Sequence, residues 1–291
     1  MMKALIVAAG YGTRFFPVTK TVPKEMLPLV DRPAISFIIE ELYHSGVREV
    51  LVISSRRKKC LEDYFDREIE LEQVLGIKGE QSKLEKLKEE YIDNMSFHFV
   101  RQKEMRGTAH AIYMARHFMA DDPFVVVYPD DIFISDPPLS KSLIEVHKKT
   151  GKNVLTGVEI PKEKISRFGI IDIGREIETD VYEVNDLIEK PRAGKAPSNF
   201  AAMGRYLFTP DFFTAVEPKL APGIHEIYQT DGIVELAQEN KVVFFNYKGE
   251  FYDTGEPLAY LKTITRYGLK NSEFANEYRE FLVNLVKEFE N

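Results

Sequence analysis

Only one cysteine, Cys60, occurs among the 291 residues of the chain. A single cysteine excludes an internal disulfide framework and a zinc site built from cysteines, and it predicts a protein of the reducing cytoplasm. No apolar run approaches the roughly 18 residues that a membrane span requires, so we expect no membrane partner. The apolar start, 1–10, is too short for a signal peptide and leads straight into a glycine turn, which predicts a first strand instead.

The sequence also lacks an excess of basic residues. Its net charge is −7 and its pI is near 5.6, which argues against a nucleic-acid partner, because general binding to nucleic acid needs a broad basic surface. Hydrophobic residues make up 44% and charged residues 29% of the chain, a composition typical of folded globular proteins. An acidic protein can still bind phosphates where a few cations gather in one cleft.

Short apolar runs alternate with helical patterns in the first half of the chain. This repeated β-α-β order predicts an α/β protein whose parallel strands are covered by helices on both faces. After Lys152 the strands follow one another with few helices between them, so we expect a mixed, mostly parallel central sheet. The expected strands are 3–8, 49–54, 97–102, 123–131, 153–160, 169–173, 181–190 and 199–208, and the main expected helices are 33–46, 107–119, 224–239 and 257–270.

Three further segments are predicted to be helical. The charged segment 67–93 is expected to form an excursion beside the sheet, and the run 56–59 (RRKK) is expected to be the solvated start of a helix. The last segment, 272–291, is amphipathic and is expected to pack on its own chain or on a neighbouring one. Its apolar side consists of Phe274, Tyr278, Phe281, Leu282 and Leu285.

A long irregular loop, 8–28, follows the first expected strand. Gly10 and Gly12 stand where glycines let backbone N–H groups approach a ligand, and Arg14 adds a charged fork suited to phosphate. A tight turn and a solvated Lys24 would explain these residues one at a time. Together they favour a phosphate site at the carboxyl edge of the sheet. The loop is neither a dinucleotide fingerprint, whose third glycine is missing, nor a Walker A motif.

Acidic residues follow two other expected strands, and a further one, Asp253, is expected in a loop. Asp130 follows a buried strand, and carboxylates at that position suit Mg²⁺, although a solvated turn or a helix cap is the alternative. Asp253 lies in a D-T-G sequence, but an aspartic protease needs two such aspartates, so a second metal ligand is the more economical interpretation. Glu189 could accept sugar hydroxyls and Lys190 could bind a phosphate, yet this pair is also commonplace at a strand end.

The stretch 8–33, AAGYGTRFFPVTKTVPKEMLPLVDRP, closely resembles the nucleotide loop of bacterial UTP–glucose-1-phosphate uridylyltransferases. The match continues in order through VRQ, RGTAHAI, YPDD, RFGIID, IEKP, PSNFAAMGRYLF, EIYQTDGI and YDTGEPLAYL, and it covers nearly the whole chain. Related thymidylyltransferases typically read SKQLLP where this chain has PKEMLP. The resemblance implies a Rossmann-like, three-layer nucleotidyltransferase fold with a catalytic domain over 1–271 and a C-terminal helical segment over 272–291.

The resemblance also implies a role for each matching position. It implies that a uridylyl group passes from UTP to α-D-glucose 1-phosphate, giving UDP-glucose and pyrophosphate, with Mg²⁺ as cofactor and a homodimer or homotetramer as the assembly. Asp131 stands at a position that varies in the family, and Glu256 stands where an asparagine or aspartate is expected, so neither receives a role. The implied contacts are Ala9, Gly10, Gln102 and Gly107 with uracil; Gly12, Thr13, Arg14 and Lys24 with the triphosphate; Asp130 and Asp253 with Mg²⁺; Gly169, Glu189 and Gly204 with glucose; and Lys190 with the sugar phosphate.

Other functions remain open at this stage. A sister enzyme could use dTTP or another sugar 1-phosphate, although Gln102 and the PKEML string favour uracil. A non-catalytic sensor of nucleotide sugars is the alternative from another class. Retention of both Asp130 and Asp253 argues against a sensor, because a sensor has no need of a metal pair.

Overall fold

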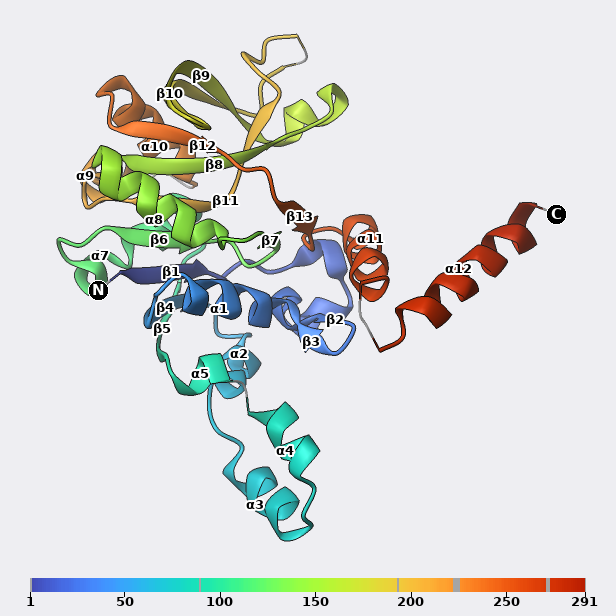
Figure 1. Cartoon of the computed structure of the whole chain (residues 1–291). Coiled ribbons are helices and arrows are strands. Elements are labelled where there is room, and N and C mark those ends of the chain that lie inside the picture. The colour runs from blue at the N-terminus through green and yellow to red at the C-terminus, as the bar shows by residue number, and fades with distance from the viewer. Residues whose placement is uncertain (1, 89, 193, 222–225, 271–272, 291) are drawn as a thin grey trace.

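A nine-stranded sheet forms the centre of the computed structural model, which describes residues 2–88, 90–192, 194–221, 226–270 and 273–290 (Figure 1). The order of its strands is β5-β4-β1-β6-β11-β8-β12-β10-β9. The strands are β1 (Lys3–Val7), β4 (Glu49–Ser54), β5 (Ser96–Arg101), β6 (Phe124–Val127), β8 (Asn153–Glu159), β9 (Gly169–Glu178), β10 (Val181–Glu189), β11 (Phe200–Phe208) and β12 (Val242–Asn246).

The sheet is mixed, as predicted, but most of its parallel pairs join the N-terminal strands. Strands β5, β4, β1 and β6 are parallel neighbours, and β8 pairs with β12 in the same sense. The pairings of β11 with β6 and β8, and those of β10 with β12 and β9, are antiparallel. Parallel pairing therefore dominates only in the N-terminal half, where helices connect successive strands.

Both faces of the sheet are covered by helices, which gives the expected three layers (Figure 1). Ala4 and Ile6 of β1 face one apolar core, whereas Leu5 faces the other, so a strand buried on both faces needs a continuous apolar run. The first core includes α1 (Ala34–His44) and α8 (Leu139–Thr150). The second core includes α6 (Thr108–Tyr113), α9 (Asp211–Val216) and α10 (Gln229–Gln238).

Three sequence predictions were wrong in detail. The single helix expected over 107–119 is broken into α6 and α7 (Arg116–Met119), because Ala115 donates to Ile112 in a tighter turn. The strand expected over 123–131 ends at Val127, and Asp131 begins a separate strand. The helix expected from residue 224 begins at Gln229, and residues 224 and 225 lie outside the described part of the chain.

A two-stranded ribbon lies beside the main sheet and carries part of the predicted site. It consists of β7 (Asp131–Ile134) and β13 (Glu250–Asp253), which are antiparallel and place Asp253 opposite Asp131. Helix α11 (Pro257–Gly268) follows this ribbon. The long loop before α1 contains three short 3-10 turns, η1 (Thr13–Phe15), η2 (Val18–Lys20) and η3 (Lys24–Met26), and ends in the hairpin of β2 (Pro28–Leu29) and β3 (Arg32–Pro33).

Two helical segments extend from the body of the molecule in Figure 1. The predicted excursion contains α3 (Ile69–Ile77), α4 (Gln81–Leu87) and α5 (Glu90–Asp93), after α2 (Lys59–Tyr64). The C-terminal α12 (Ala275–Glu290) projects away beyond α11. None of the helices within the described residues has the length and apolarity needed to cross a membrane.

Candidate active site

The predicted phosphate loop and the predicted metal ligands meet at one end of β6. Lys24 of η3 lies 2.5 Å from Asp130, its Nζ to Oδ2, although the two residues are 106 positions apart. Burial would raise the pKa of Asp130, but the Lys24 ammonium outweighs burial and the net pKa is lowered. Lys24 is thus no solvated lysine: it is a partly buried cation at the carboxyl edge of the parallel strands.

The ribbon brings Asp253 to Asp130. The Thr254 backbone N–H donates to the Asp130 carbonyl at 2.8 Å, and the Thr254 hydroxyl donates to the same oxygen at 3.0 Å. A Cβ built on Gly255 would lie 2.8 Å from Asp130 Oδ2 and 3.2 Å from Asp253 Oδ1, so both carboxylates border one small space. Burial, with the charge of Asp130, raises the pKa of Asp253. Asp253 ends a strand rather than lying in a free loop.

Asp131 has a structural partner of its own. Its Oδ2 accepts the Gly204 backbone N–H at 2.8 Å, which ties the start of β7 to β11. Burial, followed by the nearby charges of Asp130 and Asp253, raises the pKa of Asp131 to about 7. Gly204, predicted to lie in the sugar pocket, is therefore adjacent to the acidic turn that carries Asp130.

The glycine-rich loop is held in a turned conformation beside these acids. Gly12 is left-handed, with φ of 65°, and its carbonyl accepts the Thr19 hydroxyl at 2.7 Å. The Arg14 guanidinium donates to the Gly255 carbonyl at 3.4 Å. Ala9 is buried, whereas Gly10 and Thr13 are exposed and free to face a ligand.

Lys58 contradicts the prediction that the run 56–59 is solvated. Its side chain is buried, and its Nζ lies 2.7 and 2.9 Å from the two carboxylate oxygens of Glu25, which is itself buried. Burial lowers the pKa of Lys58 despite the attraction of Glu25. Because Glu25 is the neighbour of Lys24, this pair fixes the turn that presents Lys24 to Asp130.

The predicted base-binding residues Gln102 and Gly107 lie in contact. The Gln102 side-chain N–H₂ donates to the Gly107 carbonyl at 3.3 Å and lies 3.1 Å from His110 Nδ1. Gly107 has φ of +90°, and a Cβ there would lie 2.2 Å from the Ile227 carbonyl oxygen, so only glycine fits. This close packing fixes the backbone in front of α6.

The predicted sugar-binding residues form a second group. Gly169 and Glu189 are paired across β9 and β10, and a Cβ on Gly169 would lie 3.1 Å from Glu189 Oε2. That oxygen accepts the Thr230 hydroxyl at 2.8 Å. Lys190 lies 3.4 Å from the other oxygen of Glu189 and sits over the Tyr228 ring at 5.2 Å.

Sequence reasoning assigned no role to the start of α10, which joins these groups. Gln229 Oε1 accepts hydrogen bonds from Thr108, next to Gly107, and from Tyr128 at 3.2 Å. Thr230, the next residue, bonds to Glu189. The only signal in the sequence was the EIYQTDGI string within the family resemblance.

A cavity of about 340 Å³ adjoins the paired aspartates. Basic side chains that the sequence analysis did not identify as site residues also line this cavity. Arg167 at the end of η4 (Lys162–Arg167) forms an ion pair with Glu256. Lys164 and Lys262 line the same cavity, which opens on Arg14. Lys164 and Arg167 lie on η4 whereas Lys262 lies on α11, so no single local motif reveals this group.

The acids fit a hard divalent cation such as Mg²⁺. Asp130 and Asp253 offer carboxylate oxygens toward the space beside Gly255, and Mg²⁺ prefers oxygen ligands. In the part of the chain that the structure describes, no cluster of three or more metal-binding side chains occurs. A cation held here would complete its coordination with substrate phosphate oxygens and water, which is its usual arrangement.

The site combines basic groups, turned glycines and paired carboxylates at the carboxyl edge of a Rossmann-like sheet. This combination is typical of enzymes that link two phosphate-bearing substrates. The family described as nucleotidyl transferase matches residues 3–268, and the chain belongs to this family. The membership of the nucleotidyltransferase family that the motifs imply is thereby confirmed.

Relatives with assigned names agree in their description. A UTP–glucose-1-phosphate uridylyltransferase 2 from Staphylococcus saprophyticus is 43% identical over 97% of both chains, and a UTP–glucose-1-phosphate uridylyltransferase from Staphylococcus epidermidis is 41% identical over 97% of this chain and 98% of its own. A UDP-glucose pyrophosphorylase solved with UDP-glucose is 36% identical, with a TM-score of 0.81 over 93% of this chain and 100% of its own. A UTP-bound UGPase from Acinetobacter baumannii is 30% identical, with a TM-score of 0.88 over 98% and 99% of the two chains.

Proposed function

We propose that this chain transfers the uridylyl group of UTP to α-D-glucose 1-phosphate, giving UDP-glucose and pyrophosphate. The observation that carries the proposal is the convergence of Lys24, Asp130 and Asp253 beside the loop of Arg14. Relatives 41–43% identical over nearly the whole chain bear the name of this activity. The reducing environment expected from a single cysteine supports a cytoplasmic location.

The proposed reaction brings two polyanions together. The phosphate of glucose 1-phosphate attacks the α-phosphorus of UTP in line with the departing pyrophosphate, so the protein must position both groups and offset their repulsion. Arg14 and Lys24 supply positive charge to the triphosphate, and Lys190 supplies it to the sugar phosphate. A phosphate monoester is already a nucleophile, so no strong general base is required. Asp130 and Asp253 would hold Mg²⁺, which when bound stabilises charge on the α-phosphate and the leaving group.

The two groups of residues around Gln102 and Glu189 are proposed to bind the two ends of UDP-glucose. Gln102 and its neighbour Gly107 form the uracil end, and Glu189 with Gly169 forms the glucose end. Gln229, bonded to Thr108 and Tyr128, and Thr230, bonded to Glu189, connect these two ends. The other proposed contacts are Ala9 and Gly10 with uracil, Gly12 and Thr13 with the triphosphate, and Gly204 with glucose.

A coupled pyrophosphate assay tests the reaction. Purified protein with Mg²⁺ should release pyrophosphate from UTP and glucose 1-phosphate, and should run in reverse from UDP-glucose and pyrophosphate. A panel with dTTP and other sugar 1-phosphates distinguishes a sister enzyme. Absence of pyrophosphate from every pair, with binding of UDP-glucose intact, would favour the non-catalytic sensor.

We expect Lys190 to contribute to the binding of glucose 1-phosphate and far less to the binding of UTP. We expect Lys190→Ala to raise KM for glucose 1-phosphate by about ten- to a hundredfold, because a lost charged hydrogen bond is worth roughly 1.5–3 kcal/mol. KM for UTP should change far less. Exposed Lys195 nearby provides the matched control as Lys195→Ala. Equal weakening of both substrates by Lys190→Ala would contradict the assignment.

Acid should weaken UTP binding through His110. Burial, and then the charge of Arg106, lowers the pKa of His110 below its usual value of 6.5, so the ring is neutral at pH 7 and Nδ1 can accept from Gln102. As the pH falls through this lowered pKa, a proton on Nδ1 faces the Gln102 amide donor. We expect KM for UTP to rise in that pH range. His110→Asn keeps an acceptor that does not titrate, and its profile should lack the additional rise; an identical profile would refute the prediction.

We further propose that the segment 272–291, outside the catalytic domain 1–271, mediates a homodimer or homotetramer. Within α12, Tyr278 reaches Thr265 of α11 at 3.5 Å, whereas Phe281 and Phe289 are exposed. Light scattering should return a mass at least twice the 33.5 kDa of one chain. A monomer mass at micromolar concentration would contradict the proposal. Phe281→Asp with Phe289→Asp should lower the mass if α12 forms the contact.

A further inference from the structure

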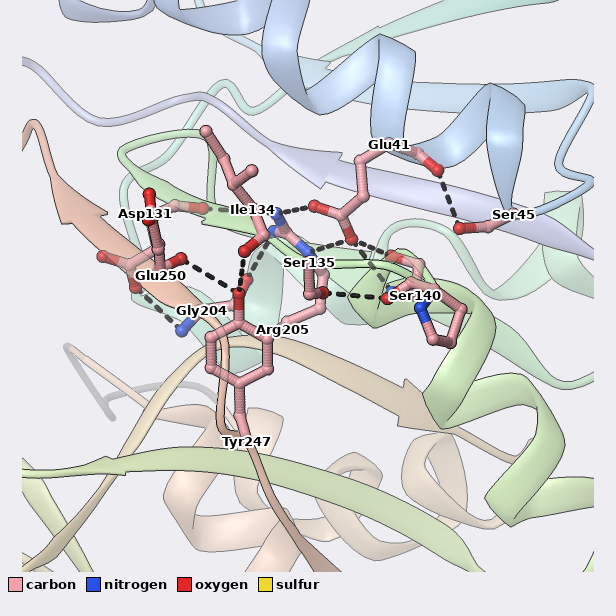
Figure 2. A network of polar contacts seen from close by, with 11 residues as sticks. Glu41, Ser45, Asp131, Ile134, Ser135, Ser140, Gly204, Arg205, Tyr247 and Glu250 are labelled. Carbon is pink, nitrogen blue, oxygen red and sulfur yellow. Dashed lines mark hydrogen bonds and ion pairs between the residues drawn. The ribbon is translucent and has the colours of Figure 1, made fainter. Parts of the chain in front are cut away.

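The guanidinium of Arg205 is fully buried next to the candidate active site (Figure 2). Its Nε donates to Glu41 Oε1 at 3.0 Å and its Nη2 donates to Glu41 Oε2 at 2.6 Å, so the pair is bidentate. Glu41 in turn accepts the Ser140 backbone N–H at 3.0 Å. The ion pair thereby joins β11 to α1 and to the start of α8.

Arg205 makes two more hydrogen bonds, and both lead to the site. Its Nη1 donates to the Gly204 carbonyl at 3.0 Å, and its Nη2 donates to the Asp131 carbonyl at 3.2 Å. Gly204 returns a bond from its own N–H to the Asp131 carboxylate at 2.8 Å. Figure 2 shows Arg205 between Glu41 on one side and the Asp131–Gly204 contact on the other.

Stability of the core alone does not explain why an arginine with these hydrogen bonds is buried here. A buried ion pair is weak evidence for stabilisation, since apolar residues of similar volume often replace it without loss. The guanidinium fork, however, offers donors in a fixed plane that a lysine cannot reproduce. Here that plane holds two backbone carbonyls, those of Gly204 in β11 and of Asp131, the residue after Asp130.

We propose that Arg205 is a positioning residue: held by Glu41, it fixes the Asp130–Asp131 turn against Gly204 and so sets the spacing between the metal-binding carboxylates and the sugar. The identities of metal and sugar rest on the proposed function. Displacements of about 1 Å in such a site can lower a rate about a hundredfold, so loss of this support should act mainly on kcat.

The test replaces the pair without leaving a buried charge. In the double variant Glu41→Leu/Arg205→Met we expect a Tm within about 5 °C of the unaltered protein. Its kcat should fall at least about tenfold, while KM for UTP stays within about twofold, because the uracil end does not contact Arg205. The dissociation constant of Mn²⁺ from protein saturated with UDP-glucose, measured by electron paramagnetic resonance, should rise several-fold. Arg205→Lys keeps the charge but loses the planar guanidinium donors, and it should show the same fall in kcat with a nearly unchanged KM for UTP. This variant provides the test if the double variant does not fold.

Asn153 provides a matched control for stability. It is buried, it accepts the Thr209 N–H at 2.8 Å and it donates to the Lys241 carbonyl at 3.0 Å, and both of these partners lie outside the candidate site. Asn153→Ala should lower Tm while leaving kcat and the Mn²⁺ constant unchanged. A folded double variant with unaltered kcat and Mn²⁺ binding would overturn the proposal, and so would an equal loss of kcat in Asn153→Ala. Absence of transfer by the unaltered protein would instead count against the proposed reaction, and the Mn²⁺ measurement would still test the spacing.

Discussion

Asp130→Asn and Asp253→Asn are each expected to lower kcat by about two orders of magnitude or more, the scale of losing one preorganised electrostatic group. The two carboxylates border the same space beside Gly255, so each should contribute to binding one Mg²⁺. High Mg²⁺ or Mn²⁺ should partly rescue each single variant. Steady-state kinetics over a range of metal concentrations measures both effects.

The double variant decides whether the two aspartates act together. Asp130→Asn/Asp253→Asn should be little worse than the poorer single variant, because groups that act as a unit are non-additive. Fully multiplicative losses, or a single variant with unchanged metal dependence, would mean that the carboxylates do not share one ion. Glu256→Gln, which alters a nearby carboxylate that is paired with Arg167, is the comparison for a general change of charge.

Lys58→Met should destabilise the fold by roughly 3–5 kcal/mol, the usual cost of removing one partner from a buried ion pair. Glu25 would be left buried and charged without the ammonium group that now contacts it, and the turn carrying Lys24 would shift with it. Urea unfolding measures the loss, and kcat should fall in the surviving folded protein. The effect is expected to exceed that of any surface charge by several-fold.

Two further variants separate burial from charge. Lys59→Met removes the exposed neighbour of Lys58 and should leave both stability and kcat within error. Glu25→Leu/Lys58→Met removes both charges and should recover most of the lost stability, because no unpaired charge remains. A Lys58→Met variant as stable as Lys59→Met would show that Glu25 finds another partner or is protonated.

The sequence predicted those parts of the fold whose pattern is local. β1 could be recognised because a strand buried on both faces is apolar at every position, and α1 because Ile35, Ile38 and Leu42 repeat with the helical period. The boundaries of β6 and α10 were less accurate. Val125 to Tyr128 reads as one apolar run, and nothing in it reveals that the strand stops at Val127 so that Asp131 can turn into the ribbon.

The site was predictable where residues lie in a recognisable string and unpredictable where they arrive from a distance. Lys24 and Asp130 belong to such strings, and the structure brings them into contact. Lys58 stands among four adjacent basic residues, and only the approach of Glu25, 33 positions earlier, determines which one is buried. Arg205 looks like one charged residue within a strand, because its partner Glu41 is 164 positions away.

The ribbon of β7 and β13 links the candidate metal ligands to local unfolding. Thr254 bonds to Asp130 from the residue after Asp253, so opening of the ribbon separates both carboxylates in a single event. Assembly of the site and closure of the ribbon are thus one equilibrium, and ligands that bind only the closed form displace it by mass action. The rate at which the Thr254 amide exchanges its hydrogen with solvent therefore reports how much of the protein has an assembled site at any moment.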